Sequence, residues 1–431
     1  MGGGLMQLVA YGAQDIYLTG QPQITFFKSV YRRHTNFAIE SIQQTINGSV
    51  TAGSRVSITI SRNGDLLKNL WIQYDPALLV PSGATSLACD LGHSIINLLE
   101  IEIGGQLIDR HYGLWLTIWR DLTEENGTGS QGRLGTNGAE PPINDPTSVP
   151  STRYQRMSYT HHGGVNVSNT TAAPTEAYIP MKFWFCRNPG LAIPLIALQY
   201  HEVKFNIQFA LASAVINPAT TSLLNLSGCN LQVYGDYVYL DTTERRQFAQ
   251  NAHEYLIDQL QFQQETSSGT TQSNTIRLNF NHPVKELIFC GTPLNPSSAA
   301  ADSVAGGATP APIVPAGNPN GTDATNTQMQ SKIILNGTDR FTMRNLKYFT
   351  RNQIWDCHTG FGATSVPDSI AVYSFALRPE EHQPSGTCNF SRIDTAQLYF
   401  TGDYVAALNI YAVNYNVLRI MSGMGGLAYS N

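Results

Sequence analysis

The chain carries four blocks of alternating β-pattern that each recur once, in the same order, along its 431 residues. The paired blocks are residues 56–74 and 275–290, 98–110 and 331–344, 183–209 and 373–400, and 231–241 and 408–420. Short alternating runs are joined there by turn sequences such as Gly104-Gly105 and Asn336-Gly337, which are typical of β-hairpins. Two copies are too few for a solenoid or a propeller. The shared order therefore indicates a tandem duplication of one all-β domain.

Composition favours β-structure whose outer surface is covered by other protein or by sugar. Charged residues make up 13% of the chain, against about 25% in typical soluble domains. Aromatic residues, Thr, Asn, Gln and Gly are plentiful instead. The formal net charge is −5, so the chain as a whole is not drawn electrostatically to nucleic acid or to an anionic membrane.

The pattern predicts an arm followed by two domains. Residues 1–26 are a glycine-containing lead that we expect to be ordered on its own or on binding. Residues 241–259 are the most charged segment, with a short helical turn expected over 243–249, and we interpret them as the linker. Helix signals elsewhere are weak, and many short strands with Gly, Pro and Asn turns predict β-sandwiches or jelly rolls. The predicted domains are residues 27–242 and 243–431.

Two long segments read as loops inserted between the repeated blocks. Residues 123–175 and 292–330 are rich in Gly, Asn, Ser, Thr and Pro, and both exceed ordinary loop lengths. The first falls between the second and third blocks of its half, and the second falls between the first and second blocks of its half. Loops of this kind concentrate on one face of a scaffold and carry surface function.

Targeting signals are not evident in the sequence. The longest apolar stretch, around 191–198, is broken by Pro194 and falls well short of the roughly 20 residues of a membrane-spanning helix. The N-terminus lacks the basic start and apolar core of a secretory signal, and Met6 stands where a myristoylation signal requires Ser or Thr. The six cysteines are scattered and predict buried free thiols in a protein made in a reducing cytoplasm.

Candidate chemistry is sparse, and we predict no active site, no cofactor and no metal site. The clusters His161-His162 and Asp356-Cys357-His358 lack tetrahedral ligand spacing. The pairs His201-Glu202 and His253-Glu254 place acid beside base, but adjacent strand residues face opposite ways. Nucleophile-elbow, Walker and Rossmann sequences do not occur in the chain.

One segment combines basic and aromatic residues. Residues 25–37 place Lys28, Arg32, Arg33 and His34 among aromatic side chains. Such a surface could bind nucleic acid, but the rest of the chain adds no basic field. We therefore interpret the segment as a solvated strand edge or as an interface with a neighbouring subunit.

The sequence contains several long strings of a recognisable kind: QLVAYGAQDIYLTGQPQITFFKSVYRRHTNFAIE, PGLAIPLIALQYHEV, HEYLIDQLQF, RLNFNHP, PSGTCNFSRID and LNIYAVNYNVLRIMSGMGGLAY. These strings resemble the major capsid proteins of large icosahedral nucleocytoplasmic DNA viruses, above all those of the algal (chlorella-type, phycodnavirus) branch. The resemblance extends from about Gln7 to Asn431 and fails mainly in the two long loops and over residues 355–367.

This resemblance implies a double jelly roll, that is, two consecutive eight-stranded antiparallel jelly rolls in one subunit. It implies a major capsid subunit that forms a homotrimer, a pseudo-hexagonal capsomer that tiles the outer shell of the virion beside neighbouring trimers. The arm would contact minor capsid proteins near an inner viral membrane without inserting into it, and no direct contact with nucleic acid is implied. The two long loops would face outward, where contact with a host surface is possible.

Asn-x-Ser/Thr motifs are frequent, and the resemblance implies a glycoprotein. Algal relatives carry sugars on outer loops, often outside this motif. Among the motif positions, the glycosylation candidates in the two loops are Asn126, Asn166, Asn169 and Asn320.

Two other functions remain open from the residues alone. A minor or vertex-associated capsid paralogue would share the fold and occupy few positions in the particle. A jelly-roll carbohydrate-binding protein or glycosidase would need exposed aromatic side chains and, for hydrolysis, paired carboxylates in one cleft. Trp115, Trp119 and Trp184 could stack on sugars, but they lie in apolar runs and are expected to be core residues.

Overall fold

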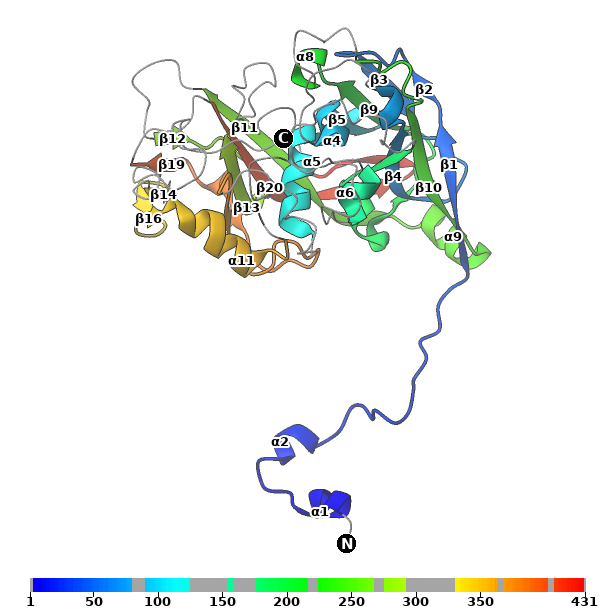
Figure 1. Cartoon of the computed structure of the whole chain (residues 1–431). Coiled ribbons are helices and arrows are strands. Elements are labelled where there is room, and N and C mark those ends of the chain that lie inside the picture. The colour runs from blue at the N-terminus through cyan, green and yellow to red at the C-terminus, as the bar shows by residue number, and fades with distance from the viewer. Residues whose placement is uncertain are drawn as a thin grey trace. The chain divides into compact units, whose positions relative to one another are not determined.

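The computed structural model describes residues 3–79, 90–124, 153–158, 176–215, 224–266, 275–291, 330–360, 362, 368–401 and 407–429 (Figure 1). It divides into two compact units, Met1–Phe37 and Ala38–Asn431. The smaller unit is the N-terminal arm, and the larger unit contains the sheets. The two long insertions lie almost entirely outside the described residues.

The first half of the larger unit holds two antiparallel sheets. One has the order β1 (Phe37–Gln44), β10 (Gln232–Leu240), β4 (Leu66–Tyr74) and β7 (Ala177–Pro180), with β8 (Ile193–Pro194) also paired to β4. The other has the order β2 (Ile46–Asn47), β3 (Arg55–Thr59), β9 (Val203–Phe209), β5 (Ile96–Ile103) and β6 (Gln106–Tyr112).

The second half repeats this arrangement. One sheet has the order β11 (His253–Thr266), β20 (Ala407–Met421), β13 (Pro283–Gly291) and β17 (Ile370–Ser374), joined by β18 (Cys388–Asn389) and β21 (Met424–Leu427). The other has the order β12 (Thr275–Arg277), β19 (Ala396–Phe400), β14 (Gln330–Leu335) and β15 (Thr338–Asp339), with β16 (Arg344–Asn345) paired to β14.

The strand orders identify two jelly rolls. When the eight principal strands of each half are ranked along the chain, one sheet reads 1-8-3-6 and the other reads 2-7-4-5, in both halves. This is the double Greek-key order of a jelly roll. Each repeated block occupies the same place in its half, so the predicted duplication and the predicted double jelly roll are confirmed.

Turn chemistry explains the hairpins that the sequence predicts. Gly104 and Gly105 have φ values of 60° and 81°, and Asn336 and Gly337 have 49° and 76°. Positive φ at both central residues is the type I′ geometry, which matches the twist of the flanking strands. The Asn336 Oδ1 also accepts a hydrogen bond of 3.0 Å from the backbone N–H of Thr395, which fixes the turn against β19.

Short helices connect the strands, and the longest of those described is buried. They are α3 (Pro76–Leu79), α4 (Leu91–Ser94), α5 (Gly113–Thr123), α6 (Arg153–Ser158), α7 (Trp184–Arg187), α8 (Ala212–Val215), α9 (Thr242–Gln250) and α11 (Gln353–Cys357), with a π-helix at Tyr348–Asn352 and 3-10 turns at Pro189–Leu191 and Phe390–Arg392. The turn expected over 243–249 is confirmed as part of α9.

The expectation of weak helix structure elsewhere was wrong at α5. Every residue from Gly113 to Leu122 is buried, although Thr117, Arg120 and Asp121 form a polar stripe along one side of the helix. The apolar residues recur with helical spacing at 114, 115, 118, 119 and 122, so the sequence does carry the period that predicts this helix. Its counterpart in the second half is the π-helix and α11, which also follow the second hairpin of their jelly roll.

The arm contains α1 (Gly3–Val9) and α2 (Ile16–Thr19), and neither helix buries a residue. The interpretation of residues 25–37 as a strand edge was wrong for 25–36, since β1 begins only at Phe37. That stretch is exposed throughout.

We expect Gly113→Ala to lower the free energy of unfolding by about 2–4 kcal/mol. A Cβ at Gly113 would lie 2.2 Å from the Ile96 carbonyl oxygen and 2.5 Å from that of His93, both in the backbone. Urea denaturation measures the change. The control is Gly4→Ala in α1, where an added Cβ meets nothing within 4 Å. Equal midpoints for both variants would contradict this account of the tight start of α5.

Candidate assembly site

The two jelly rolls are joined by an apolar core of their own, which we call the junction core. Helix α5, which lies between β6 and β7 of the first roll, contributes Leu114, Trp115, Ile118, Trp119 and Leu122. The second roll contributes Ile288, Cys290, Ile354, Ile370, Val372, Tyr411 and Val413. Trp115 lies between Trp119 and Tyr411, with ring centroids 5.6 and 5.3 Å away. Large aromatic contacts of this kind hold the rolls together by burial of apolar area.

The alternation of β13 and β20 shows why this core exists. Leu287 and Phe289 face the interior of the second roll, whereas Ile288 and Cys290 between them face the junction core. On β20, Ile410 and Ala412 face inward and Tyr411 and Val413 face the junction. Successive strand residues point to opposite faces, so this sheet is apolar on both sides and requires a cover on each.

Hydrogen bonds cross the junction beside the apolar contacts. The backbone N–H of Leu260 donates to Asp109 Oδ1 over 3.1 Å, and the Gln259 side chain donates to the Ile108 carbonyl oxygen. The N–H of Gly360 donates to the Leu122 carbonyl oxygen at the end of α5 over 2.7 Å. These directional bonds fix the orientation of one roll against the other.

The C-terminal strand makes a second set of crossing contacts. The N–H of Tyr200 donates to the Gly423 carbonyl oxygen over 3.0 Å. His201 Nδ1 lies 2.9 Å from the Gly425 carbonyl oxygen, and the N–H of Leu427 donates to Gln106 Oε1 over 3.3 Å. The last strand of the second roll is thereby anchored to the first.

Buried ion pairs surround the junction core. The Arg120 guanidinium on α5 lies 2.9 Å from Asp90 Oδ1 and 2.7 Å from Asp121 Oδ1, and all three side chains are almost completely buried. Burial alone would lower the pKa of Arg120, but the two carboxylates raise it instead. Such a cluster loses much stability when one partner is removed, since a buried charge is then left uncompensated.

A second cluster links the rolls directly. Asp258 on β11 accepts from Lys285 Nζ at 3.0 Å, and its Oδ2 lies 3.3 Å from Arg187 Nη2, which comes from the first roll. Lys285 also donates to the Pro379 carbonyl oxygen over 2.8 Å. Burial lowers the pKa of Lys285, against the attraction of Asp258.

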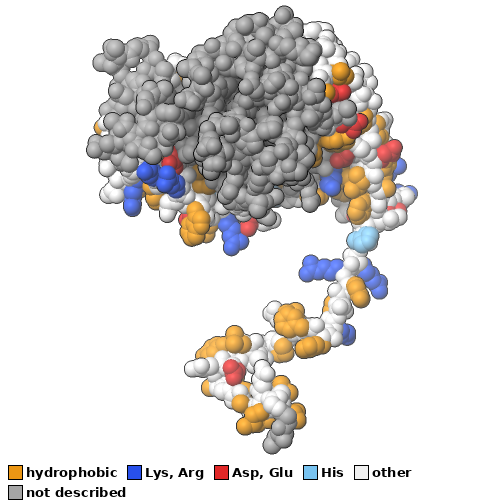
Figure 2. Space-filling model, in the orientation of Figure 1, with side chains coloured by type: hydrophobic (Ala, Val, Ile, Leu, Met, Phe, Trp, Pro, Cys, Tyr) orange, Lys and Arg blue, Asp and Glu red, His pale blue; other side chains and the backbone are white. Residues whose placement is uncertain are grey.

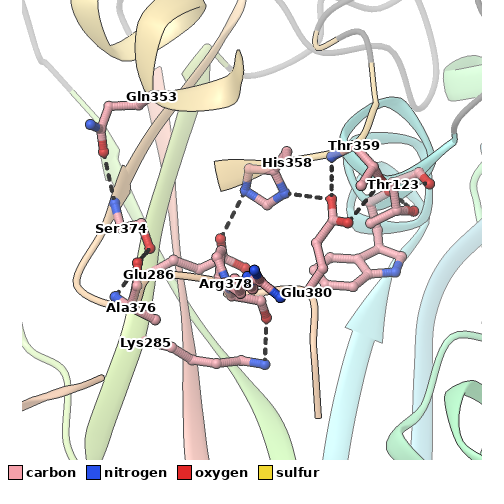
Figure 3. A network of polar contacts seen from close by, with 12 residues as sticks. Thr123, Lys285, Glu286, Gln353, His358, Thr359, Ser374, Ala376, Arg378 and Glu380 are labelled. Carbon is pink, nitrogen blue, oxygen red and sulfur yellow. Dashed lines mark hydrogen bonds and ion pairs between the residues drawn. The ribbon is translucent and has the colours of Figure 1, made fainter. Parts of the chain in front are cut away.

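The third cluster centres on His358, which follows α11 (Figure 3). Its Nε2 lies 3.0 Å from Glu286 Oε2, and its Nδ1 lies 2.9 Å from Glu380 Oε1. Burial alone would lower the pKa of His358, but the two carboxylates raise it from 6.5 to about 9. The backbone N–H and hydroxyl of Thr359 also donate to Glu380, and the same hydroxyl contacts the carbonyl oxygen of Thr123 in α5.

This geometry places His358 in a structural role. Both ring nitrogens are occupied by carboxylates, so the cluster Asp356-Cys357-His358 does not present this ring to a metal ion. Over the described residues, no group of three or more His, Cys, Asp or Glu side chains is arranged to hold a metal ion. The other proposed cluster, His161-His162, lies outside the described residues.

The acid–base pairs considered for catalysis are separated by the fold. His253 Nε2 lies 2.8 Å from the Phe248 carbonyl oxygen, while Glu254 accepts from Arg419 over 2.8 Å. His201 contacts the backbone of Gly425 instead of its neighbour Glu202.

The tryptophans considered for sugar stacking are core residues, as expected. Trp115 and Trp119 are 3% and 4% exposed in the junction core, and Trp184 is 1% exposed in the core of the first roll. Cys229 and Cys290 are buried as predicted, whereas Cys186, Cys357 and Cys388 are half-buried; none of these five forms a disulfide. Cys89 lies outside the described residues.

The arm presents a continuous series of exposed apolar side chains (Figure 2). Phe27 is 98% exposed, and Tyr17, Phe26 and Tyr31 are similarly accessible. Lys28, Arg32 and Arg33 lie in the same segment. Exposed apolar residues at this density mark a surface for binding other macromolecules.

None of the helices in the described part of the chain is long and apolar enough to cross a membrane. The glycosylation candidates Asn126, Asn166, Asn169 and Asn320 lie outside the described residues.

Sequence reasoning missed the junction core and its buried charges. The one available signal was the pair Arg120-Asp121 inside the apolar run of residues 114–122. Charged residues are rarely fully buried unless they are paired.

We expect stability to fall as the pH rises from 6.5 through about 9, because the folded protein holds the His358 proton that the unfolded chain releases. The contribution is complete below pH 6.5, and its loss above pH 9 amounts to something on the order of 3 kcal/mol. Urea denaturation at both pH values measures it. His358→Gln should be less stable at pH 6.5 and should lose this part of the pH dependence, whereas His34→Gln in the exposed arm should retain it. Identical pH profiles for the unaltered chain and His358→Gln would refute the assignment.

Comparison with known proteins identifies the family. A family model for the major capsid protein N-terminus matches residues 25–241, and a model for the large eukaryotic DNA virus major capsid protein matches residues 244–426. The chain is 47% identical to the major capsid protein of Pyramimonas orientalis virus and 43% identical to that of Paramecium bursaria Chlorella virus 1, with 100% of this chain and 100% of each relative covered.

The fold is also similar to that in a quasi-atomic structure of the PBCV-1 virus capsid, with a TM-score of 0.71, 36% identity, and 94% of this chain and 100% of that chain covered. The resemblance seen in the sequence is thus confirmed, and the family is one of structural proteins and not of enzymes. The chain belongs to the major capsid proteins of large eukaryotic DNA viruses, which form the icosahedral capsid.

Proposed function

We propose that three copies of the chain form a homotrimer of pseudo-hexagonal outline, and that these trimers tile the outer shell of the virion. The observation that carries this proposal is the repeated jelly roll with a firm junction. Two rolls with one strand order supply two similar corners per chain, so a cyclic trimer has six. Cyclic symmetry closes the trimer, and weaker contacts between trimers extend the lattice.

The junction clusters support this arrangement. A subunit that tiles a lattice must hold its two rolls at one angle, because an error in the angle would be repeated at every contact. Packed aromatic side chains, backbone hydrogen bonds and the Arg187–Asp258 ion pair all cross between the rolls. The orientation of the two rolls is therefore determined by directional contacts as well as by apolar burial.

The domain boundaries that go with this function are an arm of residues 1–26, a first jelly roll of residues 27–242 and a second of residues 243–431. Helix α9 supports the division, because it lies between the last strand of the first roll and the first strand of the second. The two family models also meet there, ending at residue 241 and beginning at residue 244.

The loops and the arm have opposite roles in this proposal. The segments 123–175 and 292–330 face outward, carry sugar at Asn126, Asn166, Asn169 and Asn320, and contact the host surface. The arm binds minor capsid proteins on the inner side, close to the viral membrane. Its exposed apolar residues interspersed with basic ones support that role. Synthesis takes place in the host cytoplasm, before assembly.

Light scattering after gel filtration tests the trimer. We expect the full chain to have the mass of three copies and to keep it on dilution, because obligate interfaces of this class commonly bury more than about 2,000 Å². Removal of residues 1–26 should leave the protein trimeric, since the sheets and cores lie in the larger unit. A monomer at high concentration would eliminate the proposal.

Substitutions in the arm test its role separately. We expect Phe26→Ser with Phe27→Ser to weaken binding to minor capsid proteins purified from particles by at least tenfold, since it removes two of the most exposed apolar side chains. The matched control is Gln23→Ser with Thr25→Ser in the same segment. Sedimentation of the trimer with those proteins measures binding. Equal losses in both variants, or no loss in either, would show that these aromatic residues do not bind them.

A further inference from the structure

A cavity of about 620 Å³ lies beside the junction, where β4 and β7 of the first roll meet α5, α6 and α7. Its walls include Trp71, Trp119 and Tyr178, and its polar groups include Asn69, Lys182 and Arg187. This volume is within the range of about 300–1,000 Å³ that is usual for small-molecule sites.

The aromatic wall of the cavity is held rigidly. The Trp71 indole stacks on Tyr234 at 4.5 Å with an interplanar angle of 10°, and Tyr178 meets it edge-on at 5.4 Å. The indole N–H donates to Asp236 Oδ1 over 3.3 Å, and the same carboxylate accepts from the Asn69 side chain over 3.2 Å. A wall fixed in this way loses little entropy when a flat molecule packs against it.

Cationic groups gather at the other side of the cavity. The Lys182 ammonium lies 5.0 Å from the ring centroid of Tyr154, and among the described residues no carboxylate is within ion-pair distance of it. The Arg187 guanidinium lies 4.8 Å above the Trp119 ring. The Nε of Arg187 is buried and has no hydrogen-bond partner among the residues that the structure describes, although such buried donors are normally satisfied.

Two cations share one carboxylate at the junction side of the cavity, since Asp258 pairs with both Arg187 and Lys285. Lys182 adds a further positive charge there, and Glu124 attracts it. Burial lowers the pKa of Lys182 because the cavity withdraws its ammonium from water. An anion bound here would offset the free-energy cost of burying the Lys182 ammonium and would form charge-assisted hydrogen bonds.

We propose that this cavity is a binding site for a small aromatic carboxylic acid. The ring of the ligand lies against Trp71 and Tyr178, and its carboxylate accepts hydrogen bonds from Lys182 Nζ and pairs with the guanidinium of Arg187, which lines the cavity. Because Arg187 of the first roll also contacts Asp258 of the second, the ligand is bound next to a contact that joins the two rolls. Occupancy therefore stabilises the folded subunit by mass action.

Calorimetric titration of the full-length assembled protein with 1-naphthoate and with its neutral analogue 1-naphthamide tests the site. We expect one naphthoate per chain, with affinity at least tenfold higher than for naphthamide, because only the acid engages the two cations. Lys182→Met should reduce naphthoate binding to the level of naphthamide, and Lys182→Arg should restore most of it. The matched control is Lys204→Met on β9 of the other sheet, which should bind as the unaltered chain does.

Several results would overturn the proposal. They are equal affinity for the acid and the amide, undiminished binding in Lys182→Met, or no binding of naphthoate at millimolar concentration. The mass and thermal unfolding of each variant show whether it is folded. The comparison of acid with amide uses the unaltered protein, so charge recognition is tested even if Lys182→Met does not fold.

Discussion

The structure depends on one packing interaction, that of the buried helix α5 against the outer face of a sheet in the second jelly roll. The sheet residues there alternate between two cores, so neither face of β13 or β20 can be left in water. Neither roll could leave its neighbour without exposing large aromatic side chains such as Trp115 and Tyr411. The subunit is therefore a joined pair of rolls, and its shape is a property of the junction.

Buried charges add direction to this contact. Apolar side chains can slide past one another at small cost, whereas the ion pair of Arg187 in the first roll with Asp258 in the second requires a defined geometry. Buried ion pairs bring little net stability, because desolvation offsets their attraction. Their contribution here is to the orientation of the two rolls. This is the property that a lattice subunit needs, since its contacts are repeated many times.

The sequence predicts local structure such as turns and strands well, and it predicts contacts between distant segments poorly. Asn336-Gly337 specifies its hairpin by turn chemistry alone, and the matching order of four blocks is sufficient for the duplicated fold. Helix α5 does carry a helical period of apolar residues, whereas the burial of its Arg120 depends on Asp90, which lies 30 residues earlier in the chain. The partners of His358 lie 72 residues before it and 22 after it, at Glu286 and Glu380, and only the jelly-roll topology brings them together.

The junction also distinguishes the two halves of a duplicated chain. Helix α5 is buried, whereas α11 at the matching place in the second half buries Ile354 in the junction core and leaves Trp355 82% exposed. Leu377 is exposed to a similar degree. In the trimer proposed above, unlike surfaces of successive copies meet, so the exposed apolar residues of one copy can be covered by a different surface of the next. Duplication followed by such asymmetry allows a threefold assembly to have a nearly sixfold outline.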